Sequence, residues 1–253
     1  MIKPNQFKLS TQTALAIALL LGASQSAFSH TRLEIPTVVE GLRVSNNVVI
    51  SHGCGDGTNV VASTVVFPDG VDSIIKVDGA EVTGSVSDYL TNYGNLYQKI
   101  MNHSVFANED EKHDASGNTV GFWVEGGKSP DYYTTYVPFR ASAAFIEPTS
   151  CASSVRVTVA VADICKVTGI SGFSETTANL WTPAVGSNFD GPGLHGFNSP
   201  ATITYTRVLE TNPLPEGCSE TGSTVDIIPS AAQLNRDMPI VKKGKQFWPK
   251  AGN

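Results

Sequence analysis

The feature that most constrains the fold is a series of short runs rich in β-branched residues. The runs cover residues 42–50, 60–67, 73–77, 120–124, 132–139, 155–164, 202–208 and 225–228. Their alternating or continuous apolar character is typical of strands that face a sandwich core. Turn-forming clusters such as Pro68-Asp69-Gly70 and Gly126-Gly127 separate them. We therefore predict an all-β protein built as a β-sandwich.

Two segments depart from this pattern. Residues 88–106 have some helical character, but they lack a regular apolar stripe and contain Gly94, so we expect a short helix or an irregular crossover. After Ser171 the composition shifts to Ser, Thr, Asn, Gly and Pro. We expect one sandwich domain over residues 30–170 and a loop-rich C-terminal extension over residues 171–253 that packs on it.

The first 29 residues have the pattern of an export signal. Lys3 and Lys8 precede an apolar run at 14–21, and Ala27-Phe28-Ser29 has small residues at the two positions that signal peptidase reads. This run is shorter than the roughly 20 residues of a membrane-spanning helix, and no later segment is long and apolar enough. We predict a signal peptide over residues 1–29 and a mature chain that begins at His30. The protein is then periplasmic or on the cell surface, and is not an integral membrane protein.

Charge and cysteine content agree with export. Without the two lysines of residues 1–29, the chain has 15 basic against 23 acidic residues, or −8, which argues against nucleic acid and anionic lipid as partners. The four cysteines form no C-x-x-C pair, and in an oxidising compartment they predict two structural disulfides. Spacing alone leaves three connectivities open for Cys54, Cys151, Cys165 and Cys218.

His30 is the first candidate metal ligand. As the mature N-terminus it would offer an α-amine and the imidazole Nδ1 on one residue, which together chelate a metal ion in a single ring. The amine has a pKa near ~8, so copper can displace its proton at neutral pH. Copper(II) binds nitrogen sites most tightly among the first-row divalent metals. We interpret His30 as a copper ligand; the alternative is a histidine that cleavage exposes by chance.

Two further patterns could complete the site. His52 ends a predicted strand two residues before Cys54, and is either a second nitrogen ligand or a structural histidine. Trp123 and Glu125 alternate on one face before a glycine turn. They are either an indole beside a metal-binding carboxylate or a core tryptophan followed by an exposed glutamate.

The other histidines are weaker candidates. His103 is the best additional ligand, and His195 lies in a glycine-rich segment. His113 belongs to the acidic segment 108–114, which we expect to be a solvated turn because its carboxylates lack the spacing of a calcium-binding loop. The sequence has no G-x-S-x-G, H-E-x-x-H or phosphate-loop motif, so it favours binding over catalysis.

Four parts of the chain resemble successive blocks of the YcnI-like copper-binding domain family. They are His30, HGCGDGTNVVASTVVFPDGV at 52–71, FWVEGGKSPDYYTTYVPFRA at 122–141 and VTVAVADICK at 157–166. The resemblance covers residues 30–166. It implies an exported, immunoglobulin-like β-sandwich that holds copper through the amine and ring of its N-terminal histidine, through a carboxylate, and near a tryptophan.

Carried onto this chain, the resemblance implies specific residues. His30 matches the N-terminal ligand and Trp123 the indole, while the carboxylate is Glu34, Glu40 or Glu125. It pairs Cys54 with Cys165, and so Cys151 with Cys218. The chain departs from the family by lacking a tryptophan-bearing block soon after Val71.

A fainter similarity is to the copper-repressible surface proteins of methane-oxidising bacteria, which hold copper(I) with two histidines and an oxidised tryptophan. No Trp-x-His occurs here, but the similarity favours His52 and His103 as a pair. Together these patterns predict an exported protein for copper uptake, storage or delivery that exchanges copper with a partner protein. Its predicted metal ligands are His30, His52, Glu125 and His103. The alternatives are a copper-dependent oxidase or oxygenase with a histidine brace, and a metal-free structural or adhesion sandwich.

Overall fold

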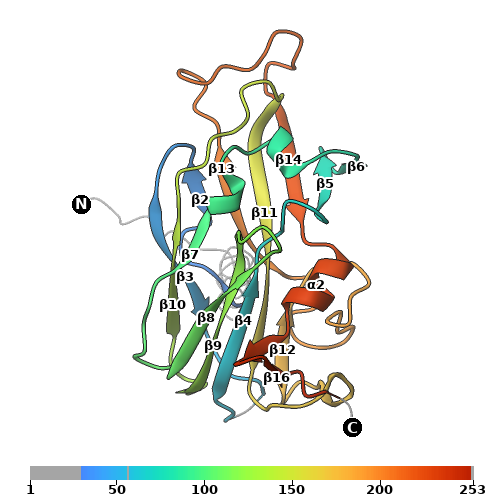
Figure 1. Cartoon of the computed structure of the whole chain (residues 1–253). Helices are drawn as coiled ribbons and strands as arrows, with labels where there is room; N and C mark the ends of the chain where they lie inside the picture. Colours follow the sequence, from blue (N-terminus) through green and yellow to red (C-terminus); the bar gives the residue numbers. More distant parts are fainter. Residues whose placement is uncertain (1–29, 56, 252–253) are drawn as a thin grey trace, which may run out of the picture. The chain divides into compact units, whose positions relative to one another are not determined.

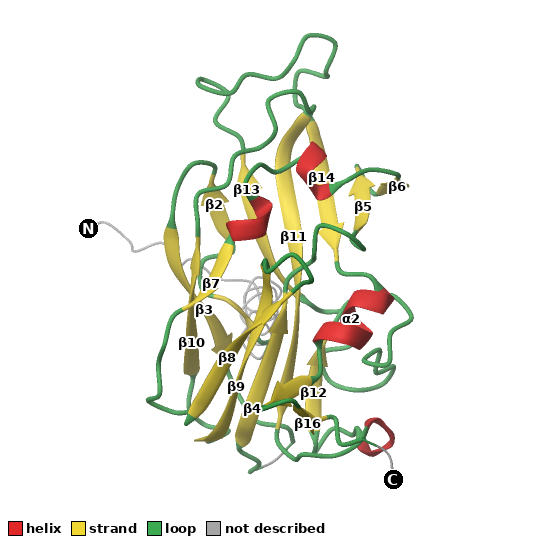
Figure 2. Cartoon of the chain, in the orientation of Figure 1, coloured by secondary structure: helices red, strands yellow, loops and turns green. Residues whose placement is uncertain are grey.

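The computed structural model describes residues 30–55 and 57–251. The predicted signal peptide lies outside the described residues. Thr31–Asn253 forms one compact unit. Strands predominate in it, and the α-helix α2 (Ala231–Asp237) and three short 3-10 turns complete the regular structure of the described part (Figure 2). The predicted all-β class is confirmed.

The smaller sheet contains strands that the alternation predicted. Its order is β1-β3-β10-β7 and all its pairs are antiparallel. The predicted strands at 42–50 and 132–139 correspond to β3 and β10. The bounds are β1 (Arg32–Leu33), β3 (Val44–Ile50), β10 (Thr135–Ala141) and β7 (Tyr97–Lys99).

The larger sheet is organised around the long strand β11 (Ala152–Ile164) (Figure 1). β4 (Val60–Val66) and β12 (Ala178–Trp181) flank its C-terminal half, and β13 (Ala201–Thr206) and β14 (Ser223–Ile228) flank its N-terminal half. The other strands extend the sheet from these neighbours. They are β2 (Thr37–Val39), β5 (Ile74–Val77), β6 (Ala80–Val82), β8 (Asn108–His113) and β9 (Thr119–Ser129).

The main core lies between the two sheets. Ile50 and Phe139 of the smaller sheet are buried in one cluster with Phe122 and Val157 of the larger sheet. Stacking of aromatic rings fills the cluster, with Phe67 3.7 Å from Tyr97 between ring centroids. Side chains from two sheets therefore meet face to face, and the predicted β-sandwich is confirmed.

A second core covers the other face of the larger sheet. Trp123 and Leu180 pack there against Leu234 and Met238 of the α2 region. A short hairpin closes this layer, formed by β15 (Ile240–Lys242) and β16 (Lys245–Trp248). Successive residues of a strand point to opposite faces, so Phe122 belongs to the main core and its neighbour Trp123 to the second.

Residues 171–253 form part of the larger sheet of the sandwich. They supply β12, β13 and β14, which hydrogen-bond to β11 within the larger sheet. The boundary expected at residue 170 thus falls inside one continuous sheet. The physical reason is the length of β11, because its thirteen residues offer pairing edges that the preceding strands do not fill.

Two local expectations had different outcomes. The segment 88–106 is an irregular crossover that contains a 3-10 turn (Tyr93–Asn95) and β7. An irregular crossover was one of the two forms predicted for it. The solvated turn expected at 108–114 is wrong, because residues 108–113 form β8. Two of its charged side chains have partners within the protein: Glu109 lies 2.6 Å from the Nζ of Lys99, and Lys112 donates to the carbonyls of Asp237 and Pro239.

Two disulfides staple the unit. Cys54 is bonded to Cys165 and Cys151 to Cys218, which are the pairs that the resemblance implied. Paired cysteines are typical of proteins that fold in an oxidising compartment. Among the helices of the described residues, none has the length and apolar character to cross a membrane.

Candidate metal centre

His52 and His195 form a close pair although 143 positions separate them. Their Nε2 atoms lie 3.3 Å apart. His52 follows β3, and its Nδ1 lies 2.5 Å from the carbonyl oxygen of Gly53. A carbonyl can only accept, so His52 Nδ1 carries the proton, and His52 Nε2 accepts the hydrogen bond that His195 Nε2 donates. One ring nitrogen donating to a carbonyl while the other faces inward is the usual arrangement of a metal-binding imidazole.

Trp181 contacts both histidines of the pair. Its ring centroid lies 6.2 Å from that of His52 and 4.8 Å from that of His195, with both contacts edge-on. Trp181 is the last residue of β12, where it pairs with Val161, and its side chain is fully buried. The indole therefore gives the histidine pair a rigid, water-excluding floor.

A buried carboxylate supports this floor. Asp163 on β11 accepts hydrogen bonds from Trp181 Nε1 (2.9 Å) and Thr31 Oγ1 (2.6 Å) at one oxygen, and from Ser63 Oγ (2.9 Å) at the other. Burial raises the pKa of Asp163 above its usual value, and the three hydrogen bonds act in the opposite direction. Both oxygens of Asp163 therefore accept hydrogen bonds from within the protein.

Each histidine of the pair precedes a glycine that local packing requires. A Cβ on Gly53 would lie 1.9 Å from the carbonyl oxygen of Thr58. A Cβ on Gly196, where φ is +94°, would lie 2.7 Å from the carbonyl oxygen of Leu180. The backbone of the 182–200 loop therefore lies directly on β12, where Leu180 N donates to the His195 carbonyl (3.0 Å).

The pair opens onto a cleft of about 400 Å³ that Asp131, Glu175 and Asn179 also line. Asp131 accepts from the Gly57 amide (2.9 Å), and Asn179 donates to the Gly53 carbonyl (3.1 Å). These contacts fix the turn that follows His52. Carboxylates beside an open histidine pair make the approach to it favourable for a cation.

The spacing of the two nitrogens fits a metal ion. Two Nε2 atoms 3.3 Å apart, each ~2.0 Å from one ion, subtend an angle of ~110° at that ion, close to tetrahedral. Within residues 30–55 and 57–251, however, no group of three or more His, Cys, Asp and Glu side chains is arranged to hold a metal. The pair therefore provides two ligands and needs a further donor.

His30 is the ligand that the sequence predicts at the mature N-terminus. Its side chain is exposed, and the next residue, Thr31, is buried and bonded to Asp163. The predicted N-terminal ligand thus precedes, by one residue, the threonine whose hydroxyl donates to the carboxylate beside Trp181.

Trp123 and Glu125 lie elsewhere. Trp123 is buried in the second core, on the face of the larger sheet opposite to that of Trp181. Glu125 is buried on the same face as Trp123 and forms an ion pair with Lys242 of β15. The core interpretation of Trp123 therefore fits its surroundings, and the indole beside the histidines is Trp181.

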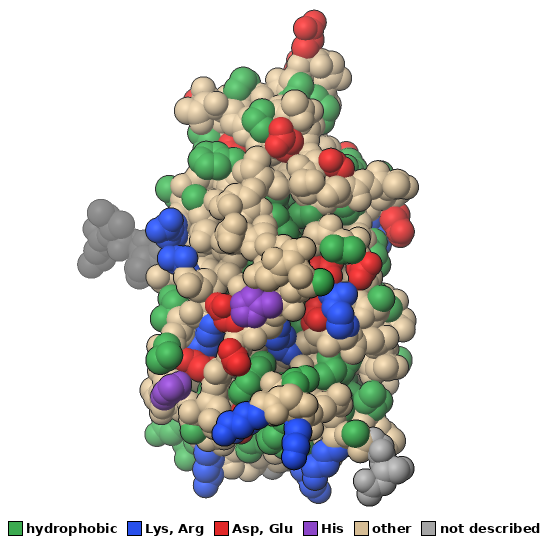
Figure 3. Space-filling model, in the orientation of Figure 1, with side chains coloured by type: hydrophobic (Ala, Val, Ile, Leu, Met, Phe, Trp, Pro, Cys, Tyr) green, Lys and Arg blue, Asp and Glu red, His purple; other side chains and the backbone are tan. Residues whose placement is uncertain are grey.

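The other candidates have separate environments. On the face drawn in Figure 3, histidine side chains lie beside acidic ones. His103 is exposed and 3.6 Å from the Glu109 carboxylate, on the β8 side of the molecule. Glu40 is buried and accepts from the backbone amides of Ile146 and Val208, while exposed Glu34 accepts from the side-chain amide of Asn47. None of these contacts joins a candidate ligand to His52.

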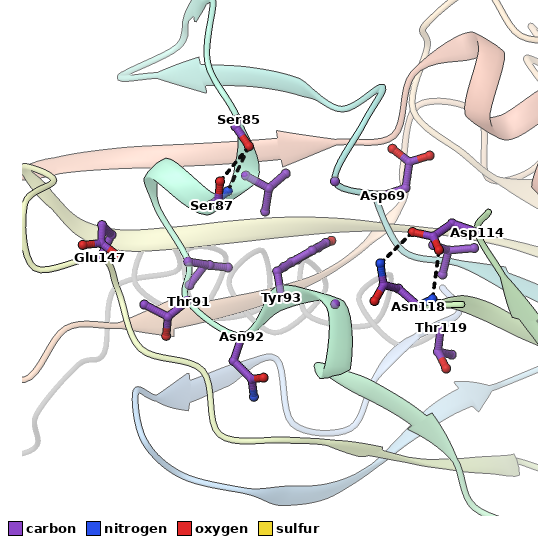
Figure 4. A pocket seen from close by; sticks show the side chains of 15 residues that line it. Asp69, Ser85, Ser87, Thr91, Asn92, Tyr93, Asp114, Asn118, Thr119 and Glu147 are labelled. Carbon is purple, nitrogen blue, oxygen red and sulfur yellow. Dashed lines mark hydrogen bonds between the residues drawn. The ribbon is translucent and has the colours of Figure 1, made fainter. Parts of the chain in front are cut away.

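A larger cavity, of about 510 Å³, carries weaker signs of a binding site (Figure 4). Its polar groups bond to one another: Ser85 to Ser87, and Asp114 to Asn118. Tyr93 donates to the Pro68 carbonyl (2.6 Å). Few polar atoms remain to orient a ligand there, so we assign the candidate site to the histidine pair.

Sequence reasoning selected His52, ranked His195 among the weaker candidates, and did not single out Trp181 or Asp163. One signal was present: both histidines of the pair stand in a His-Gly dipeptide within a glycine-rich segment, at 52–57 and 191–196. Glycines that allow two backbone segments to approach closely indicate loops that have one packed conformation.

Comparisons with known proteins add little. No protein-family model matches the chain, and no curated protein matches it. The chain is similar to a solved structure of an uncharacterized protein from Nocardia farcinica that is described as having an immunoglobulin-like fold. The identity is 12%, the match covers 70% of this chain and 98% of that one, and the TM-score is 0.34. Because this TM-score is low, the fold is assigned from the strand pairing described above.

Proposed function

We propose that this protein is an exported copper-binding protein for copper uptake, storage or delivery. The metal is held by His30, as the mature N-terminus, together with His52 and His195. The observation that carries the proposal is the 3.3 Å separation of the His52 and His195 Nε2 atoms above the buried indole of Trp181.

The chemistry of the donor set favours copper. Imidazoles and an amine form a nitrogen-rich site, for which copper ranks highest among first-row divalent metals. Among the described residues all cysteines are in disulfides, so the site has no thiolate to favour zinc or an iron–sulfur cluster. The indole edge of Trp181 excludes water from one side of the ion.

Exposure of the site supports transport rather than a structural role. His195 is exposed, and the cleft beside the pair reaches solvent. A structural metal site is normally closed by four protein ligands. An open one allows a partner protein to deliver or accept the ion by ligand exchange.

Titration of copper into the processed protein and into a form with one extra residue before His30 tests the proposal. The extra residue removes the α-amine from the chelate ring, so we expect copper affinity to fall at least about tenfold. Equal affinity of the two forms would show that the N-terminus is not a ligand. The folding of both forms is checked by urea unfolding.

The Glu125→Gln substitution is expected to leave copper affinity within about twofold of wild type. Glu125 faces Lys242 in the second core, away from Trp181 and the histidines. Glu125 is buried and Lys242 is partly exposed, so loss of their ion pair lowers stability, and urea unfolding checks that the variant is folded. A clear loss of copper binding in a folded Glu125→Gln protein would restore Glu125 as the carboxylate ligand.

A copper oxidase or oxygenase is the second candidate, favoured by the second histidine and by the open cleft. Oxygen consumption by the copper-loaded protein with ascorbate distinguishes the two. A rate above that of His195→Ala protein at equal copper concentration favours the enzyme, and equal rates favour a binding protein.

A further inference from the structure

The start of the mature chain is held unusually firmly. Terminal residues of a domain commonly fray. Thr31, which would be the second residue after processing, is only 3% exposed, and its hydroxyl donates to Asp163 across 132 positions of sequence. β1 then begins at Arg32 and pairs with β3, the strand that leads to His52.

Asp163 is a costly residue at this position. It is 0% exposed, on the main-core face of β11, where the alternate residues Val161 and Val159 are apolar. Its hydrogen-bond partners are three uncharged groups, on Thr31, Ser63 and Trp181. A buried carboxylate whose hydrogen-bond donors are all uncharged is expensive, and an apolar residue would serve the core better.

The two hydrogen bonds to one oxygen of Asp163 indicate a role for this buried carboxylate. Thr31 adjoins the N-terminal ligand, and Trp181 is the floor of the histidine pair, so a single oxygen joins both parts of the candidate site. We infer that Asp163 is a positioning residue for the N-terminal metal ligand, which acts by clamping Thr31. This inference rests on the proposed function.

The clamp pre-organises the ligand. With Thr31 fixed, the Cα of His30 lies ~3.8 Å from a fixed atom, and the amine and ring of His30 have few positions to search. Holding a ligand in place before the ion arrives lowers the entropy cost of binding.

Thr31→Val and Ser63→Ala form a matched pair for testing the clamp. Each removes one hydroxyl that donates to Asp163, and both residues are buried. Only Thr31 adjoins His30. We expect Thr31→Val to lower copper affinity ~10–100-fold, Ser63→Ala to change it less than about twofold, and Thr31→Ser to retain wild-type affinity. Equal losses in Thr31→Val and Ser63→Ala would overturn the inference, since a purely structural carboxylate predicts them.

A metal-free measurement separates this inference from the proposed function. An aminopeptidase should remove His30 from the apo Thr31→Val protein about tenfold faster than from wild type or Ser63→Ala, because a hydrogen bond to a carboxylate no longer holds residue 31. Equal trimming rates would overturn the clamp even if copper binds. Normal protection in a wild-type protein that binds no copper would instead overturn the proposed function and leave the clamp in place.

Discussion

Replacing His195 with alanine in the processed protein is expected to lower copper affinity ~100-fold or more, and His52→Ala should have an effect of the same size. Removing a residue that merely orients a ligand already costs ~10–100-fold, and here the ligand itself is lost. The Nε2 atoms of the pair lie 3.3 Å apart, and each imidazole supplies one of the two nitrogens of the proposed site. Isothermal titration with a competing chelator measures the change.

His103→Ala is the matched control for His195→Ala. Both histidines are exposed, but His103 lies beside Glu109 on the β8 side. We expect it to bind copper like wild type, and both variants to unfold at the wild-type urea concentration. Wild-type copper affinity in His195→Ala would remove the histidine pair from the site, and a loss in His103→Ala alone would favour the two-histidine set predicted from sequence.

Removing the Cys54–Cys165 disulfide is expected to have the largest effect on stability. In the chain-entropy description, opening a loop of 111 residues costs ~4.8 kcal/mol, and native disulfides typically contribute about 2–5 kcal/mol. The Cys54→Ala/Cys165→Ala protein should therefore lose about 2–5 kcal/mol in urea unfolding. It should also bind copper less tightly, because Cys54 anchors the turn that follows His52.

The second disulfide provides the comparison. Cys151–Cys218 closes 67 residues, for which the same description gives ~4.4 kcal/mol, and it joins the start of β11 to the loop before β14. Cys151→Ala/Cys218→Ala should lose similar stability but keep wild-type copper affinity at temperatures where it is folded. Equal copper binding by both double variants would show that the Cys54–Cys165 bond does not hold the site.

Several strands of both sheets could be predicted because their apolar periodicity is local. β3, β4, β10 and β11 each contain one of the alternating or continuous apolar runs. β8 could not be predicted, because its charged residues have the composition of a solvated turn. They form a strand beside Lys99 and the end of α2, which supply partners for Glu109 and Lys112. Such pairing depends on contacts between distant segments, which composition does not encode.

The candidate site shows the same division. Alternation placed Trp123 and Glu125 on one face correctly, but it cannot say which core that face meets. Trp181 reaches the histidines because β12 pairs with the C-terminal half of β11, and His195 because its loop folds back onto β12. Both contacts depend on the sheet order, so His52 alone of the pair was prominent in the sequence.

The disulfides were predictable in number but not in pairing. An even set of cysteines in an exported chain predicts two bonds, and the spacing left three connectivities. The bond between Cys54 and Cys165 follows from the pairing of β4 with β11, whose ends bring these cysteines together. The resemblance to the YcnI-like family implied the same two pairs.

X-ray absorption at the copper edge tests the central claim most directly, with one equivalent of copper bound to the processed protein. We predict a shell of nitrogen neighbours at ~2.0 Å with outer scattering from several imidazole rings, and the loss of one ring in His195→Ala. A shell without imidazole scattering, or an unchanged spectrum in both His52→Ala and His195→Ala, would contradict copper binding by this histidine pair.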